Sequence, residues 1–345
     1  MQTAKHQRIE WIDVVKGIAI ILMIVGHTDC PKTPRHMIFS FHMPLFFILS
    51  GLTFSPAKDW KSLLRKTWRS FCGLILPIVV VIVLQTGYNL IVDGKFSLPT
   101  YWAHVRGMFL SGLYWASGVA ADGVAVLGVF WFVFSLFWGK LIVNLFSLLF
   151  GEKSALYLST VTAMWVIYLG KGIYMPQNMD VTLVAVLFIS AGMTARRYMD
   201  WIRRYKVPLF VIGIALWAVG FGESAYIQMA ARHYPKGMLC ILTALAGSFS
   251  VCCIGEALSN NLIVRKALSF VGRHTLIMLI LHHLFWSYSH YWAASSVPLM
   301  QLKRVALNIA LTSAIVLLLH GLRWLIRRLL PQKAPTPAPD AGHAE

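Results

Sequence analysis

Two ionisable residues, Lys16 and His27, lie in one apolar segment near the start of the chain, WIDVVKGIAIILMIVGHT over residues 11–28. They are eleven positions apart, and at ~100° per residue this spacing returns to within about 20° of the same helix face. At ~1.5 Å per residue they lie roughly 16 Å apart along the axis. The sequence therefore predicts one buried helix with an amine near one end and an imidazole near the other.

The chemistry open to this pair is proton transfer. A neutral imidazole can take a proton from a hydroxyl, so His27 is a candidate general base. His42, in the next apolar segment, is expected at a similar depth, and two histidines on adjacent segments can line one cavity. Two alternatives stay open: His27 ends a helix by bonding a carbonyl or a headgroup, and Lys16 extends to the membrane surface, paired with Asp13.

Further polar or aromatic candidates lie in later segments. Ser50 precedes Gly51 in the segment over 37–54, where small residues allow helices to approach closely. His282 lies near the middle of LILHHLFW and is either a cavity residue or a satisfied core histidine. Trp131, in VFWFVFSLFW, faces either lipid or a cavity.

A basic segment, KDWKSLLRKTWR, follows the second apolar segment. Arg65 and Arg69 are four residues apart and share a helix face. With Lys66 they could bind the phosphates of a cytosolic donor such as a nucleotide or coenzyme A. Membrane topology alone explains the same cluster, so both interpretations stay open.

The composition is that of a membrane protein. Hydrophobic residues make up 58% and charged residues 13% of the 345 residues, and the mean hydropathy is +0.66; a soluble domain is about 25% charged. The segments long enough to cross a ~30 Å core lie near 11–28, 37–54, 71–92, 124–148, 154–170, 180–195, 207–222, 237–257, 274–292 and 305–326. The fourth is interrupted by Lys140.

These segments predict an all-α, polytopic integral membrane bundle of about ten transmembrane helices. Residues 1–330 form one domain, and the Pro/Ala-rich stretch 331–345 is expected to be a disordered cytosolic tail. The segment 93–123 is expected outside, as an interfacial helix or a re-entrant piece.

Charge orients the predicted bundle. Most of the 31 Lys and Arg fall on one side if both termini are cytosolic, as the positive-inside rule requires. The net charge of +18 is therefore mainly topological, and we expect no nucleic-acid partner. The five cysteines include no CxxC; a Cys30–Cys240 bridge is topologically allowed. No spacing supplies a third ligand beside the two histidines, so no metal or cofactor is expected.

Several of these motifs resemble acyltransferase family 3, a family of membrane acyltransferases whose first helix carries Arg or Lys, ten residues, and then His. Lys16 and His27 match that pattern. FHMPLFFILSG is similar to the version in the fucose 4-O-acetylase-like branch, and GVFWFVFSLF resembles the family's Trp-Phe motif. VGRHTLIMLILHH resembles its late motif, with Thr275 in the usual Ser place and His282 as the closing His. The basic motif departs from the family because it lacks the second Arg.

The resemblance implies transfer of an acyl group, usually acetyl from cytosolic acetyl-CoA, to a sugar hydroxyl. The acceptor would be a cell-surface glycan or its lipid-linked precursor, in the cytoplasmic membrane of a bacterium. The polysaccharide synthesis machinery and membrane lipid are further candidate partners. In this scheme Arg65, Lys66 and Arg69 hold the donor, Lys16 and His27 are catalytic, and His42, Ser50, Trp131 and His282 shape the cavity.

Two other classes compete with an enzyme. A transporter or flippase would use Lys16 and His27 as a proton or solute path without covalent chemistry. No inverted repeat supports it. A membrane subunit of a polysaccharide synthase would leave the intramembrane Lys and His unexplained.

Overall fold

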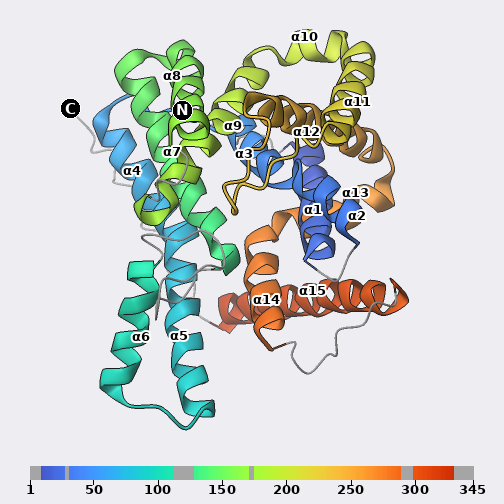
Figure 1. Cartoon of the computed structure of the whole chain (residues 1–345). Coiled ribbons are helices and arrows are strands. Elements are labelled where there is room, and N and C mark those ends of the chain that lie inside the picture. The colour runs from blue at the N-terminus through green and yellow to red at the C-terminus, as the bar shows by residue number, and fades with distance from the viewer. Residues whose placement is uncertain (1–8, 28–30, 112–127, 171–174, 289–297, 330–345) are drawn as a thin grey trace, which may run out of the picture.

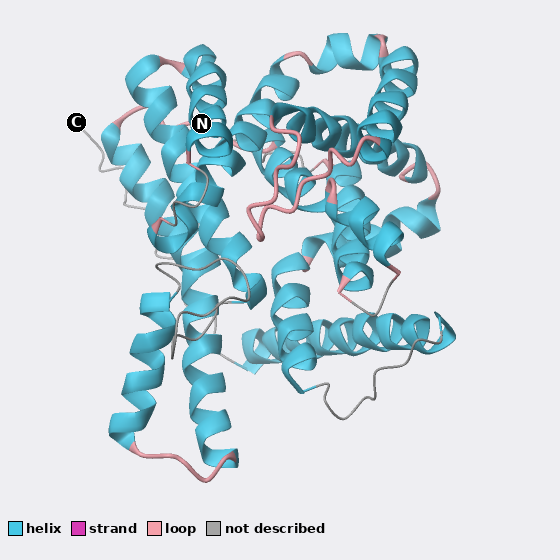
Figure 2. Ribbon diagram, in the orientation of Figure 1, coloured by secondary structure: helices cyan, strands magenta, loops and turns pink. Residues whose placement is uncertain are grey.

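The computed structural model describes residues 9–27, 31–111, 128–170, 175–288 and 298–329. Throughout these residues the chain is helical, apart from loops and one isolated β-bridge between Gln228 and His233 (Figures 1 and 2). The predicted all-α class is therefore confirmed. The tail after residue 330, and Cys30 with its proposed bridge, lie outside the described residues; Cys240 is a free thiol.

Where the structure describes them, the predicted membrane segments are mainly helical. The α-helices are α1 (Glu10–Gly26), α2 (Lys32–Phe39), α3 (His42–Leu52), α4 (Trp60–Ser70), α5 (Leu76–Val92), α6 (Leu98–Ser111), α7 (Trp131–Phe150), α8 (Glu152–Met164), α9 (Met179–Arg197), α10 (Met199–Arg204), α11 (Lys206–Gly222), α12 (Met238–Leu258), α13 (Leu262–Arg273), α14 (Thr275–Tyr288) and α15 (Pro298–Leu329). Short π-helical turns, η1 (Phe71–Ile75) and η3 (Trp165–Leu169), extend α4 and α8, and 3₁₀ turns, η2 (Gly128–Phe130) and η4 (Pro176–Asn178), precede α7 and α9.

The structure differs from the predicted spans in three places. The segment 37–54 is two helices, because the ring of Pro44 would clash with the carbonyl of Ser40 if one helix ran through both. Lys140 does not interrupt the fourth segment, since α7 is continuous through it. The last helix, α15, runs across the picture below α1 rather than parallel to it (Figure 1).

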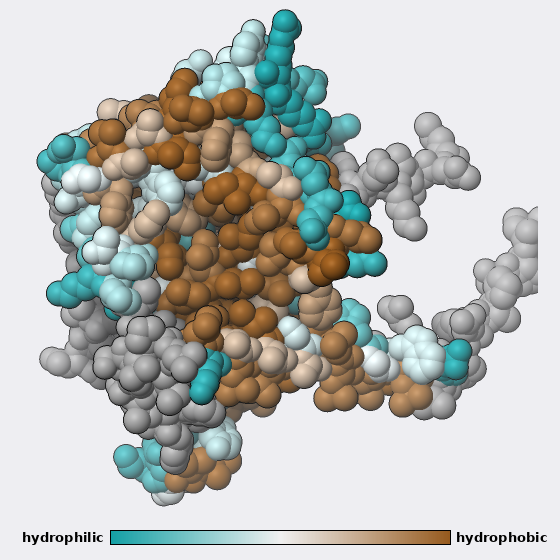
Figure 3. All heavy atoms as spheres, turned by 90° about the vertical axis from the view of Figure 1, so that its right-hand side faces the viewer, coloured by the Kyte–Doolittle hydropathy of each residue, from teal (hydrophilic) through white to brown (hydrophobic). Residues whose placement is uncertain are grey.

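Five helices of the described chain are long and apolar enough to cross a membrane, or six if the bent pair α13 and α14 counts as one span. The side of the molecule formed by α11, α12 and α13 is hydrophobic across its middle, with hydrophilic residues along its upper edge (Figure 3). Large apolar side chains are exposed on α11, for example Val207 and Val211, and on α5, for example Leu84. Such surface fits contact with lipid, as in a membrane bundle.

Helix α1 lies inside the bundle and packs against α3, α12 and α13. Its crossing with α13 is close because Gly17 faces the backbone of Leu268, while Gly272 faces the backbone of Asp13. A similar crossing joins α3 to α9 through Gly51 and Gly192, where a Cβ on either would overlap the facing backbone. These glycines fix the helices that carry the candidate site.

Candidate active site

A cavity of about 420 Å³ lies between α1, α3, α7 and α14, bordered by the loop that follows α11. The predicted residues Lys16, His27, His42, Ser50 and Trp131 all line it. Most other lining side chains are apolar, among them Ile20, Met23, Phe46, Phe132 and Leu136. The structure thus brings the residues of three separate sequence motifs to one space.

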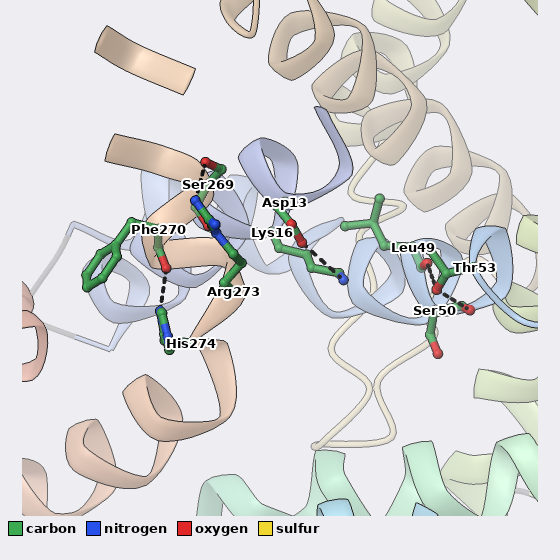
Figure 4. A network of polar contacts seen from close by, with 9 residues as sticks. All are labelled: Asp13, Lys16, Leu49, Ser50, Thr53, Ser269, Phe270, Arg273 and His274. Carbon is green, nitrogen blue, oxygen red and sulfur yellow. Dashed lines mark hydrogen bonds and ion pairs between the residues drawn. The ribbon is translucent and has the colours of Figure 1, made fainter. Parts of the chain in front are cut away.

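The polar residues occupy opposite ends of this cavity. At the end where α1 finishes and α3 begins, the ring of Phe39 lies 5.4 Å from that of His27 and 5.0 Å from that of His42. We call this the imidazole end. At the other end, Lys16 points toward Ser50 and Thr53 near the finish of α3 (Figure 4).

Lys140 joins Lys16 at that second end, which we call the ammonium end. It lies on α7 nine residues after Trp131, or ~14 Å along the helix axis. The start of α7 is near the imidazole end, because Phe130 packs 4.4 Å from the ring of His283, the neighbour of His282. The cavity therefore has amines at one end, imidazoles at the other and apolar walls between them.

Both histidines at the imidazole end are oriented by hydrogen bonds to the turn of helix before them. His27 contacts the Met23 carbonyl through Nδ1 at 2.8 Å, and His42 contacts the Ile38 carbonyl through Nδ1 at 3.0 Å. A carbonyl only accepts, so Nδ1 carries the proton in each ring and a neutral ring has its lone pair on Nε2. This is the tautomer that a general base acting through Nε2 requires.

His282 supports the imidazole end without lining the cavity. It is buried, its ring lies edge-on to that of His27 with centroids 5.5 Å apart, and its Nδ1 is 3.5 Å from Nδ2 of Asn308 on α15. Thr275, one residue into the motif that contains it, does line the cavity. His282 is therefore placed to position the ring of His27.

Among the described residues, one carboxylate pairs with a lysine of the ammonium end. Asp13 is buried, and its Oδ1 lies 3.7 Å from Nζ of Lys16, the predicted pairing at i, i+3 (Figure 4). The Ser50 hydroxyl nearby is buried and makes no hydrogen bond within the described part of the chain. Thr53 donates to the carbonyls of Leu49 and Ser50.

The basic segment forms α4, whose N-terminus is closed by a capping box between Asp59 and Ser62. Arg65 and Arg69 are exposed on α4. Lys66 instead turns back and donates to the carbonyls of Ser55 and Pro56. Of the predicted donor-binding residues, the structure leaves the two arginines on the surface and uses Lys66 to attach α4 to the loop before it.

A loop that sequence analysis did not single out forms another wall. Residues 228–231 of the segment between α11 and α12 line the cavity. The loop is held by an ion pair between Arg232 and the buried Asp180 at the start of α9. In the sequence, both residues are charged positions next to apolar segments. This is the only sequence signal that could have indicated a role for them.

Comparison with known families shows the family of the chain. A family model described as an acyltransferase domain matches residues 9–324, nearly the whole described chain. The chain belongs to acyltransferase family 3. No curated protein and no solved structure matches it.

Membership of this acyltransferase family confirms the resemblance seen in the motifs and supports acyl transfer in general. It also agrees with a membrane protein, since the matched region contains the apolar helices described above. Among the described residues, no group of three His, Cys, Asp or Glu is placed to hold a metal ion.

Proposed function

We propose that this protein is an O-acyltransferase of the cytoplasmic membrane of a bacterium that moves an acetyl group from cytosolic acetyl-CoA to a sugar hydroxyl. The acceptor is a cell-surface or exopolysaccharide sugar, or its lipid-linked precursor. Both termini are cytosolic, so the ammonium end of the cavity faces the cytosol and the imidazole end faces outward.

The observation that carries this proposal is the two-ended cavity in a chain of an acyltransferase family. A donor with an anionic head and a thin neutral arm fits amines at one end and apolar walls beyond them. An acceptor hydroxyl fits the end with a base. Exposed Arg65 and Arg69 lie on the same helix as Lys66 and would meet the phosphates at the membrane surface.

The reaction then needs one base and one positioned carbonyl. His27 Nε2 takes the proton of the sugar hydroxyl as the hydroxyl oxygen attacks the thioester carbonyl. The C–S bond breaks, the acyl–oxygen bond forms, and coenzyme A leaves as the thiolate, which takes from His27 the proton that came from the sugar hydroxyl. His42, Ser50 and Trp131 shape the space around the thioester, and exclusion of water by the apolar walls limits hydrolysis.

The test is transfer of labelled acetyl from acetyl-CoA by the purified protein in lipid vesicles, with surface glycans extracted from cells that lack the protein as acceptors. The proposal predicts label in a glycan fraction with wild-type protein, in an ester that mild base removes. Transport of an unmodified solute without labelled product would favour a transporter and contradict the proposal.

A further inference from the structure

Lys140 lies on the apolar helix α7. It has no role in the proton transfer proposed above and is not part of the basic segment on α4. A lysine in a membrane helix is costly unless it meets a partner or water, and it marks a functional position by default. Its side chain lines the main cavity at the ammonium end. In the described part of the chain no carboxylate pairs with it, whereas Lys16 beside it has Asp13.

The charges at the ammonium end therefore do not balance. Two ammonium groups, from Lys16 and Lys140, line this end of the cavity, whereas the described residues that line the cavity include no carboxylate. Asp13 pairs with Lys16 without lining the cavity. The buried Ser50 hydroxyl adds a donor that lacks a hydrogen-bond partner among the described residues. Two cations and an unpartnered hydroxyl donor that border one cavity are suited to an anion with several acceptor oxygens.

Lys140 also lines a second cavity, which lies beside the basic segment. This narrow cavity of about 40 Å³ is lined by Lys140, Asn144 and Lys66. Asn144 fixes this junction, because its Nδ2 donates to the Lys140 carbonyl while its Oδ1 accepts from the Ala57 backbone at 2.7 Å. The loop before α4 is thereby attached to α7 at the level of Lys140.

The length of the cavity fits a particular anion. From Lys16 to His27 the rise is roughly 16 Å, and from Lys140 to Trp131 it is ~14 Å. In coenzyme A, about twelve bonds separate the diphosphate from the sulfur, as in four extended residues, or ~13 Å. A diphosphate at the ammonium end would therefore place the thioester at the imidazole end.

We propose that Lys140, together with Lys16, binds the diphosphate of the acyl-CoA donor inside the cavity. This inference rests on the proposed function. The basic segment lacks the second Arg of the family motif, and Lys140 would supply part of the donor binding in its place. The diphosphate would then lie inside the bundle and not on the surface of α4.

The test compares binding of two donors that differ in the anionic group. Equilibrium binding of coenzyme A and of neutral pantetheine, which keeps the arm and lacks the phosphates, is measured with the full-length protein in detergent or lipid. Lys140→Met removes the charge and keeps the shape of the side chain; Lys140→Arg keeps the charge. Lys153→Met, an exposed lysine at the start of α8 away from the cavity, is the matched control.

We expect Lys140→Met to weaken coenzyme A binding by about ten- to a hundredfold, the range for hydrogen bonds to charged groups, and to leave pantetheine binding unchanged. Lys140→Arg retains most of the affinity, and Lys153→Met retains all of it. The thermal midpoint of Lys140→Met should not fall, because the change breaks no ion pair among the described residues.

Three results would overturn the inference. In the first, Lys140→Met binds coenzyme A as wild type does, while wild type still transfers acetyl; the proposed function then stands without this residue. In the second, Lys140→Met loses coenzyme A and pantetheine equally, which assigns Lys140 to the shape of the cavity. In the third, wild type does not bind coenzyme A at all, and the proposed function fails with the inference.

Discussion

At the imidazole end of the cavity, His27 and His42 each contact a carbonyl of their own preceding turn. The amines at the ammonium end come from two helices, and among the described residues only that of Lys16 is paired with a carboxylate. The first arrangement fixes ring orientation and tautomer before any substrate arrives. The second leaves positive charge for a ligand to neutralise. The comparison indicates that one end is built for chemistry and the other for holding an anion.

The two ends also differ in whether contacts close in sequence or contacts between distant segments position their side chains. Hydrogen bonds at i, i+4 orient the histidines, so the imidazole end depends mainly on where α1 and α3 meet. The ammonium end depends on the Asn144 contact between α7 and the loop before α4. Variants at the two ends should therefore change different kinetic constants.

The largest effect is expected from His27→Ala. Loss of a general base should lower kcat by about 10²–10⁴-fold and leave the KM for acetyl-CoA nearly unchanged, because the donor is held at the far end. The measurement is initial-rate acetyl transfer in vesicles, with membrane insertion and thermal midpoint matched to wild type. A near-native rate in a well-inserted variant would remove His27 from the mechanism.

The next effect is expected from Lys16→Met. It removes one of two cations at the ammonium end, so the KM for acetyl-CoA should rise by about tenfold or more. The substitution also removes the ion-pair partner Lys16 from the buried Asp13, so the thermal midpoint should fall. The double variant with Asp13→Asn should regain stability and keep the high KM; recovery of the low KM would show that Lys16 acts only through folding.

His282→Ala should have a smaller effect and touch only the imidazole end. The ring of His282 packs on that of His27 outside the cavity, so its loss should lower kcat by roughly tenfold or less, through misplacement of the base. The conservative His282→Asn, which keeps a polar group of similar length, should recover part of the rate. A change confined to donor KM would contradict this positioning role.

The smallest effect is expected from the exposed arginines. Arg65→Ala and Arg69→Ala each remove a surface charge, and exposed ion pairs contribute about 0.2–1 kcal/mol. The KM for acetyl-CoA should therefore rise only by up to about fivefold, and the difference from wild type should shrink at high salt. An unchanged KM for Arg69→Ala at low salt would remove the phosphate role of this surface.

Much of this arrangement was open to prediction from the sequence. The spacing of Lys16 and His27 gave their common face, apolar length gave the helices, and the motifs gave the family, because each depends on local pattern. The shared cavity needs helices far apart in sequence to meet. The small residues at Gly51 indicate a close helix approach, but the sequence does not show that Gly51 faces α9 or that Gly17 faces Leu268 of α13.

Lys140 shows where sequence reasoning failed and why. In the sequence, a lysine within an apolar segment suggests that the membrane helix is interrupted, because a hydropathy average does not distinguish the faces of a helix. The structure keeps α7 continuous and turns this one side chain into the cavity. The break at Ser40–Phe41 was missed for a related reason: a hydropathy average does not register that Pro44 forbids one continuous helix.

One experiment tests whether the imidazole end performs the chemistry and the ammonium end binds the donor. Acetyl transfer is measured against acetyl-CoA concentration for wild type, His27→Ala and Lys16→Met/Asp13→Asn. Saturating donor should restore the rate of the lysine variant to near that of wild type and should leave the histidine variant slow at every concentration. If both variants are rescued by donor, or neither is, the two ends do not have separate roles and the account is wrong.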